Sequence, residues 1–214
     1  TLSVARAQVG SEVRHGAFWW SLSGHSYSIP KVLRSGVKRR ELRERLRALK
    51  VDRLYTFAQP LMRGAQAQRL RRWHRELHRD HIASYLLLGS PVWVCDASEL
   101  TALLSDRFSP FQKGGQAHER FRGVYLDIEP HALRADDDRC LYRWDHLTAT
   151  QKRGLLYRLL QVVIDTHSAL NLLDEQIVER GHEMRLSVYL PAWLDHLHTP
   201  DALWKSPRQR DAFY

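Results

Sequence analysis

Apolar residues follow two alternating patterns along the chain, short β-favouring runs and longer stretches with helical spacing. The short runs predict five strands, over 17–20, 53–58, 82–88, 123–128 and 185–190. Apolar stripes between them predict four helices, marked by Leu42-Leu46-Leu49, Leu70-Trp73-Leu77, Leu100-Leu103-Leu104 and Leu156-Leu159-Val163. Strands therefore alternate with helices, which is typical of a parallel α/β sheet.

Polar residues mark the starts of two of these helices. Asp96 with Glu99, and Thr148 with Gln151, have the three-residue spacing of a capping box. In that motif two side chains bind the free backbone N–H groups of the first turn. The spacing predicts a third helix beginning near Asp96 and a long fourth helix beginning near Thr148.

The alternation fits either an open doubly wound sheet or a (β/α)8 barrel. A nucleotide-binding open sheet needs a Gly-rich loop after its first strand, but residues 20–25 contain one glycine and no phosphate-binding motif. Aromatic and acidic residues gather instead at carboxyl ends of strands, where barrel enzymes build their sites. We therefore expect a single α/β domain over 1–214 of the (β/α)8 TIM-barrel type. A full barrel takes about 250 residues, so we expect a fragment truncated to about the first five βα units, with strands six to eight outside it.

The fourth predicted strand carries the strongest chemical signal, Gly123-Val124-Tyr125-Leu126-Asp127-Ile128-Glu129-Pro130. Side chains alternate along a strand, so Tyr125, Asp127 and Glu129 share one face. The other face is apolar and is expected to pack against helices, which turns the two carboxyl groups into the barrel. Two acids on one enclosed face repel each other, so one pKa should rise. We expect that group to be Glu129, unless the acids form ion pairs with nearby Arg or amide groups.

This segment resembles the fourth strand of glycoside-hydrolase-like (β/α)8 barrels and is distantly similar to the DxxDxDxE strand of chitinase-like family 18 enzymes. Only the final Asp-x-Glu matches, because Arg122 and Tyr125 stand at the two earlier Asp positions. The LDxEP form is also similar to that of uncharacterised bacterial barrels. The resemblance implies a polysaccharide hydrolase in which Glu129 is the general acid and Asp127 its electrostatic partner. It also implies a periplasmic or extracellular location, and it requires no cofactor and no metal.

Aromatic residues at strand ends are candidates for binding sugar, because sugar rings present flat C–H faces that stack on aromatic rings. The candidate substrate-binding residues are Tyr125, Trp20, Trp93, Tyr189, Trp193 and Tyr55. A strand cannot point both Trp19 and Trp20 inward, so only one of these neighbours belongs to the site.

Two other functions fit the same residues. A barrel that keeps the groove without cleaving would be a glycan-binding protein, since two acidic positions of the chitinase-like strand are absent. A metal-dependent phosphodiesterase or other hydrolase would use Asp127 and Glu129, with His131 or a His from another loop, to hold Mg or Ca. The predicted partner is a polysaccharide or oligosaccharide, and the sequence predicts no nucleic-acid partner.

Charge is unevenly placed along this chain of 214 residues with net charge +9. Residues 31–81 hold 16 basic and 5 acidic residues, or +11, whereas the remaining residues hold 17 and 19, or −2. This basic block suggests an anionic polymer partner, but we assign it to polar helix faces. His74, His78 and His81 are expected on the same solvated surface. No apolar run reaches the roughly 20 residues of a membrane helix, and Cys95 and Cys140 permit at most one disulfide.

Overall fold

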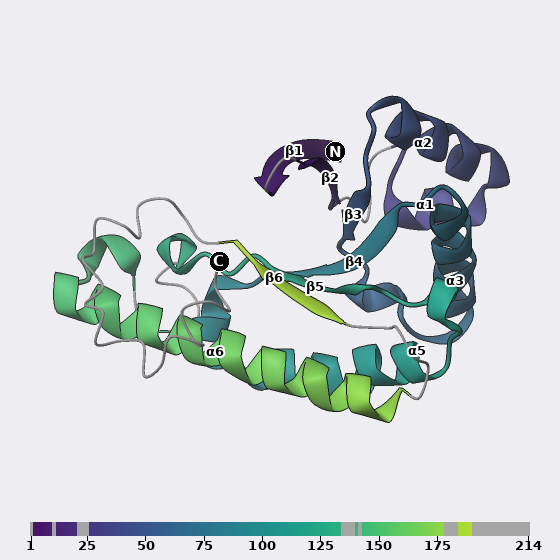
Figure 1. The fold of residues 1–214 in the computed structure, drawn as a ribbon. Helices are drawn as coiled ribbons and strands as arrows, with labels where there is room; N and C mark the ends of the chain where they lie inside the picture. Colours follow the sequence, from purple (N-terminus) through teal and green to yellow (C-terminus); the bar gives the residue numbers. More distant parts are fainter. Residues whose placement is uncertain are drawn as a thin grey trace.

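The computed structural model describes residues 2–9, 12–20, 26–133, 140, 143–177 and 184–189 as one curved sheet with helices around its outer side (Figure 1). Its strands are β1 (Leu2–Val9), β2 (Glu12–Trp19), β3 (Arg53–Thr56), β4 (Ala83–Leu88), β5 (Gly123–Leu126) and β6 (Arg185–Val188). The α-helices are α1 (Ile29–Arg34), α2 (Gly36–Ala48), α3 (Gly64–Arg79), α4 (Ser98–Leu103), α5 (Ser109–Lys113) and α6 (Ala149–Gln176). Short helical turns are η1 (Gln59–Leu61), η2 (Pro91–Val94), η3 (Leu104–Phe108, a π-helical segment), η4 (Ala117–Glu119), η5 (Pro130–Ala132) and η6 (Trp144–His146).

The strands lie in the sheet in the order in which they occur in the chain. Strands β2 to β6 are parallel, with Phe18 opposite Tyr55, Tyr55 opposite Tyr85 and Tyr125 opposite Ser187. The five predicted strands and the α/β class are thus confirmed. Each crossover from one parallel strand to the next contains at least one helix, which is how parallel strands are joined.

One strand was not expected from the sequence. β1 pairs antiparallel with β2 over its whole length, from Leu2 opposite Trp19 to Val9 opposite Glu12. It occupies the edge of β2 that the last strand of a closed (β/α)8 barrel would use. In the described residues the sheet therefore has two edges, β1 and β6.

The helix-facing side of the sheet forms the main core. Val124, Leu126 and Ile128 are completely buried there, as the alternation along β5 predicted. Leu54, Leu86 and Leu88 from the neighbouring strands belong to the same cluster of buried residues, together with residues of α2, α3 and α6. Because side chains alternate along a strand, burial of this side against the helices turns the intervening side chains to the opposite side of the sheet.

The start of α6 agrees with the sequence, whereas the start of α4 does not. Thr148 Oγ1 accepts the N–H of Gln151 at 3.3 Å, and Gln151 Oε1 accepts the N–H of Thr148 at 2.9 Å, which completes the capping box. α4 instead begins after Ala97 and has no side-chain cap. Asp96 Oδ1 accepts the N–H of Ser98, so it stabilises the turn before the helix.

The expected solvated surface of α3 needs one correction. His78 and His81 are exposed, but His74 is buried between the rings of Phe111 and Phe121, 5.8 and 4.4 Å away. Its Nδ1–H donates to the carbonyl of Glu119 at 2.8 Å. Burial lowers the pKa of His74 to about 4, so it is neutral at physiological pH. Among the described helices, none has the length and apolar character needed to cross a membrane.

Candidate functional site

The side of the sheet that faces away from the helices is lined by aromatic rings. Phe18 stacks on Tyr55 at a centroid distance of 4.8 Å, and Tyr125 lies 4.7 Å from Tyr55 and 5.2 Å from Phe18. Tyr85 lies 5.3 Å from Tyr55, so rings from β2, β3, β4 and β5 form one continuous group. We call this group, with Trp20 and Phe57, the aromatic face. It places the predicted residues Tyr55 and Tyr125 together.

Trp20 extends the aromatic face toward the carboxyl ends of the strands. Its ring lies 6.4 Å from both Phe18 and Phe57 in stacked arrangements, and 40% of the residue is exposed. Trp19 points to the opposite side, where it is 2% exposed and packs edge-on against Trp73 at 5.8 Å. Of the two neighbours, Trp20 is therefore the one available to a ligand.

Two glycines permit close approaches that the site needs. A Cβ atom on Gly16 would lie 2.8 Å from Cε2 of Tyr55, so Gly16 leaves space for that ring on the aromatic face. A Cβ atom on Gly89 would lie 2.2 Å from the carbonyl oxygen of Asp127. Gly89 thus lets the end of β4 approach the backbone that carries the carboxyl pair, a role that the sequence did not reveal.

Asp127 and Glu129 follow β5 at its carboxyl end. The N–H of Asp127 donates to the carbonyl of Leu88 at 2.8 Å, which keeps Asp127 in register with β4 although β5 ends at Leu126. Glu129 lies next to the turn η5, and Pro130 ends the extended segment as predicted. The Nε2 atom of His131 lies 3.8 Å from Oε1 of Glu129, with both side chains more than one-third exposed. Asp127 is thus a half-buried acid, and Glu129 next to it is an accessible one.

The two carboxyl groups act on each other through charge, as their shared face predicted. Burial raises the pKa of Asp127, and the negative charge of Glu129 raises it further, while His131 opposes this shift. The raised pKa belongs to Asp127, which corrects the prediction from the sequence that Glu129 carries it. The physical reason is depth, because Asp127 is the member closer to the rings. Burial and the charge of Asp127 also raise the pKa of Tyr125, so its hydroxyl remains protonated.

The other predicted sugar-binding residues are not all brought together. Tyr189 follows β6, donates its N–H to the carbonyl of Leu126 at 2.8 Å and is 42% exposed, so it lies beside the carboxyl pair. Trp93 is 3% exposed in the helix-side core, and its Nε1–H donates to Glu99 at 3.3 Å. It was expected at the site because it follows β4, but η2 turns it into the core. Trp193 lies outside the described residues.

A disulfide joins the two connections that flank the site. Cys95, just after η2, is bonded to Cys140, which lies in the connection between η5 and α6. Cys140 is 2% exposed, so its end of the bond is buried in the main core. The bond links the segment after β4 to the segment that carries Glu129 and His131.

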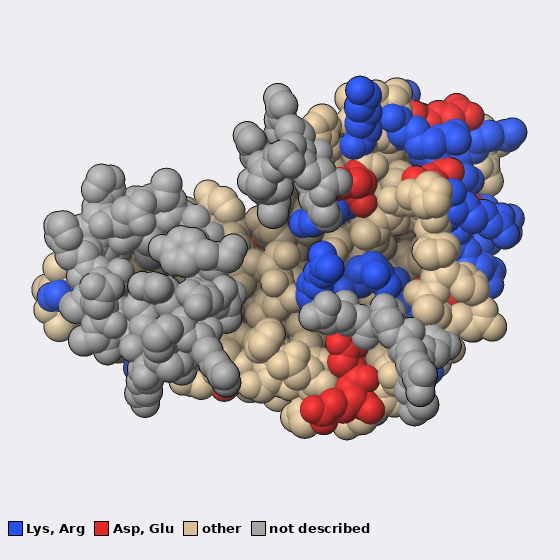
Figure 2. All heavy atoms as spheres, in the orientation of Figure 1, with Lys and Arg blue, Asp and Glu red and all other residues tan. Residues whose placement is uncertain are grey.

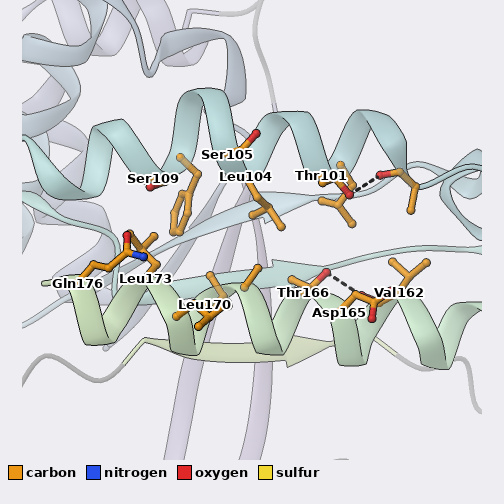
Figure 3. Close-up of a pocket in the computed structure, with 15 residues that line it drawn as sticks. Thr101, Leu104, Ser105, Ser109, Val162, Asp165, Thr166, Leu170, Leu173 and Gln176 are labelled. Carbon is orange, nitrogen blue, oxygen red and sulfur yellow. Dashed lines mark hydrogen bonds between the residues drawn. The ribbon is translucent and has the colours of Figure 1, made fainter.

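A groove lies away from the aromatic face, on the helical side of the molecule. It is a groove of about 330 Å³ between α6 and the continuous helical stretch α4–η3–α5 (Figure 3). Leu104 lines it from the α4–η3–α5 wall and Leu170 and Leu173 from α6, and Asp165 is its single acidic residue. Because one carboxylate among apolar side chains does not provide an acid and base pair, we place the candidate site at Asp127 and Glu129. The described residues contain no group of three or more His, Cys, Asp or Glu arranged to hold a metal ion.

Comparison with protein-family models, with curated proteins and with solved structures finds no match to this chain.

Proposed function

We propose that this chain is part of a glycoside hydrolase that acts on a polysaccharide at the carboxyl end of the aromatic face. Glu129 is the general acid that protonates the glycosidic oxygen, and Asp127 is its electrostatic partner. Tyr125, Tyr55, Trp20 and Tyr189 form the surface on which sugar rings bind. The proposal makes the sheet the first part of a glycoside-hydrolase-like (β/α)8 barrel.

The observation that carries the proposal is the place of the carboxyl pair. Asp127 and Glu129 follow Tyr125 at the carboxyl end of the aromatic face, and Tyr189 is exposed just after the adjacent strand β6. Trp20 is exposed next to Phe18, whose ring contacts Tyr125. Aromatic faces bind the C–H faces of sugars, and paired carboxyl groups are the usual catalysts of glycosidic bond cleavage. The consecutive order of β2 to β6 is that of neighbouring strands in a barrel, in which sites form at this same end. Closure of the barrel requires β1 to leave the edge of β2 that it occupies.

The raised pKa of Asp127 suggests how the pair divides its work. Burial and the charge of Glu129 raise the pKa of Asp127, so the two carboxyl groups lie close enough to interact through charge. Glu129 is the more accessible of the two and meets the glycosidic oxygen. As Glu129 gives its proton to that oxygen, His131, whose Nε2 lies 3.8 Å from Oε1 of Glu129, is placed to stabilise the carboxylate that forms. A substrate without an internal nucleophile requires a further carboxylate, at about 5–5.5 Å for retention.

The test is the substitution Glu129→Gln in the longest available form of the protein, with release of reducing ends measured on a panel of polysaccharides. General acid catalysis contributes roughly 10²–10⁴-fold, so we expect a loss of at least about 100-fold. Binding of oligosaccharides should stay within about threefold. Glu175→Gln, which removes an exposed acid on α6, is the matched control and should leave the rate unchanged. A Glu129→Gln protein that hydrolyses at the normal rate would contradict the proposal.

The substitution of Tyr125 and Arg122 for the two earlier acids favours one alternative, a glycan-binding protein that does not cleave. Tyr125 packs against Phe18 and Tyr55 at the position of an acid. Oligosaccharide binding that depends on Trp20, without release of reducing ends by the wild type, would support this alternative. Hydrolysis of a phosphodiester that stops on addition of EDTA would instead support the metal-dependent alternative.

A further inference from the structure

The outer surface of α2 and α3 is strongly basic. Figure 2 shows Lys and Arg gathered on one side of the molecule over these helices. Exposed positions recur along both helices at helical spacing, so the cations form two neighbouring rows. On α2 and α3 the exposed arginines are Arg40, Arg45, Arg47, Arg69, Arg72, Arg75 and Arg79. We call this surface the basic face.

Two acids next to the basic face, Glu76 and Asp80, are already paired with arginines. Glu76 accepts from Arg39 of α2 at 3.1 Å and from Arg72 at 3.2 Å. Asp80 accepts from Arg43 at 2.9 Å and lies 3.8 Å from Arg47. These pairs fix α2 against α3 and leave two more arginines than carboxylates between them.

Other cations of the basic face have no such partner. Arg40, Arg69 and Arg79 are exposed, and no carboxylate of the described residues lies within ion-pair distance of them. Lys31 and Arg34 of the adjoining α1 are also exposed, and no carboxylate of the described residues lies within ion-pair distance of them either. Holding so many like charges together without counter-charges raises the electrostatic free energy of the folded state, and an anionic partner would lower it. Guanidinium groups also bind carboxylates in bidentate geometry, which favours a partner with oxyanions.

We propose that the basic face binds an acidic polysaccharide, one whose sugar units carry carboxylate groups. The choice of a polysaccharide rests on the proposed function, because a hydrolase with a glycan site at one end of the sheet gains local substrate concentration from a second contact. The basic face would hold the polymer by charge, while the aromatic face binds the sugar rings to be cleaved. The substrate class is then a polyuronate rather than a neutral glycan.

Two observations favour this partner over nucleic acid. The exposed aromatic residues of the described chain, Trp20, Tyr157 and Tyr189, all lie outside α2 and α3. The partly buried ring of Tyr27 beside α2 is already covered by Arg45 at 4.7 Å and Lys38 at 5.6 Å, so it is not open to stacking by bases. The sides of α2 and α3 opposite the basic face are packed against the core. Within the basic face, Glu44 is exposed between the cations of α2. Such an interrupted row of charges suits a polymer with one charge per sugar better than a duplex with one charge per about 1.7 Å.

The test measures binding of polygalacturonate, a neutral glucan and duplex DNA to the wild type and to two variants of equal charge. One variant carries Arg40→Gln, Arg69→Gln and Arg79→Gln. The control carries Lys113→Gln, Arg153→Gln and Arg158→Gln, which are exposed or partly exposed cations elsewhere. At about 0.1 M salt we expect the first variant to bind polygalacturonate about tenfold more weakly and the control within about twofold. The wild-type affinity should fall as salt is raised.

Equal affinity of the wild type and the first variant for polygalacturonate would overturn the inference. Tighter binding of duplex DNA, lost in the first variant, would overturn it in favour of a nucleic-acid partner. In the binding measurements all three proteins also carry Glu129→Gln, so bound polymer is not hydrolysed, and cleavage is measured separately with the wild type. If a neutral glucan is bound and cleaved by the wild type while polygalacturonate is not bound, the inference fails and the proposed function stands. If polygalacturonate is bound through the basic face and nothing is cleaved, the proposed function fails and the inference stands.

Discussion

The two sides of the sheet bury apolar residues in different ways. The helix-facing side is mostly aliphatic and encloses its polar groups, as His74 shows between Phe111 and Phe121 with a backbone acceptor. The opposite side is aromatic, and it ends in a half-buried carboxyl group, Asp127, beside an accessible one, Glu129. Both sides shift a pKa by burial, but only one leaves the shifted group within reach of a ligand.

A shifted pKa therefore identifies a candidate site only where a ligand can also reach the group. His74 has its pKa lowered because the charged form is excluded from an apolar environment, and no ligand can approach it. Asp127 has its pKa raised by the same desolvation, with a second titratable group next to it. The first is a property of the core, and the second belongs to a pair that can exchange protons with a substrate.

Adjacent tryptophans give the sharpest test of the two sides. Trp19→Ala should lower the free energy of unfolding by about 3–5 kcal/mol, because it leaves a cavity where the buried ring packs against Trp73. Trp20→Ala should change stability by less than about 1 kcal/mol and weaken oligosaccharide binding about tenfold. Chemical denaturation and binding titration of the same two proteins measure both effects. Loss of glycan binding in a folded Trp19→Ala protein, with normal binding in Trp20→Ala, would reverse the assignment of the sides.

The buried histidine predicts a pH dependence on the helix side. The pKa of His74 is about 4 when folded and about 6.5 when unfolded, so the unfolded chain binds the proton more tightly between these values. The contribution of His74 to the free energy of unfolding is fully present above about pH 6.5. It decreases by about 3 kcal/mol as the pH drops toward 4. Asp127, whose pKa is raised, contributes with the opposite sign, because its ionisation above the unfolded value opposes folding.

Denaturation of the wild type and of His74→Asn at several pH values measures this slope. The variant should lose it, whereas His78→Asn, which changes an exposed histidine on the same helix, should keep it. An unchanged slope in His74→Asn would show that other groups carry the acid sensitivity.

Gly89 tests the geometry of the accessible side with a smaller change. In Gly89→Ala the new methyl group would meet the carbonyl of Asp127, so the carboxyl pair must move. Hydrolysis should fall about 100-fold, since displacements of about 1 Å have effects of that size. Gly154→Ala is the control, because its Cβ meets nothing within 4 Å on an exposed part of α6, and it should raise stability by about 0.5–1 kcal/mol. Equal rates in both variants would show that the position of Asp127 is not critical.

Much of the fold was available from the sequence because burial follows strand and helix periods. The apolar alternation of Val124, Leu126 and Ile128 fixed which side of β5 faces the helices, and hence where Asp127 points. β1 was missed because its small and polar residues give a weak strand pattern, although Gly10-Ser11 between two runs is a hairpin signal. His74 also had a signal, since it lies four residues after Leu70 and three before Leu77 on the buried stripe.

The parts of the site that the sequence could not give depend on residues far apart in the chain. The approach of Gly89 to Asp127 is visible only when β4 and β5 are in register. The raised pKa of Asp127 depends on depth, which a local motif does not encode. Trp93 follows a strand as a binding residue would, yet η2 turns it into the core.

The disulfide between Cys95 and Cys140 has a consequence for the unfolded chain. The two cysteines are 45 residues apart, so the bond closes a loop that contains α4, α5 and β5. Closing a loop of that length removes unfolded-state entropy worth about 4 kcal/mol in the chain-entropy model. Such bonds persist in oxidising compartments and are reduced in most cytosols. The disulfide therefore supplies part of the stability of the segment that carries Glu129. Whether the disulfide forms depends on the redox potential of the surroundings.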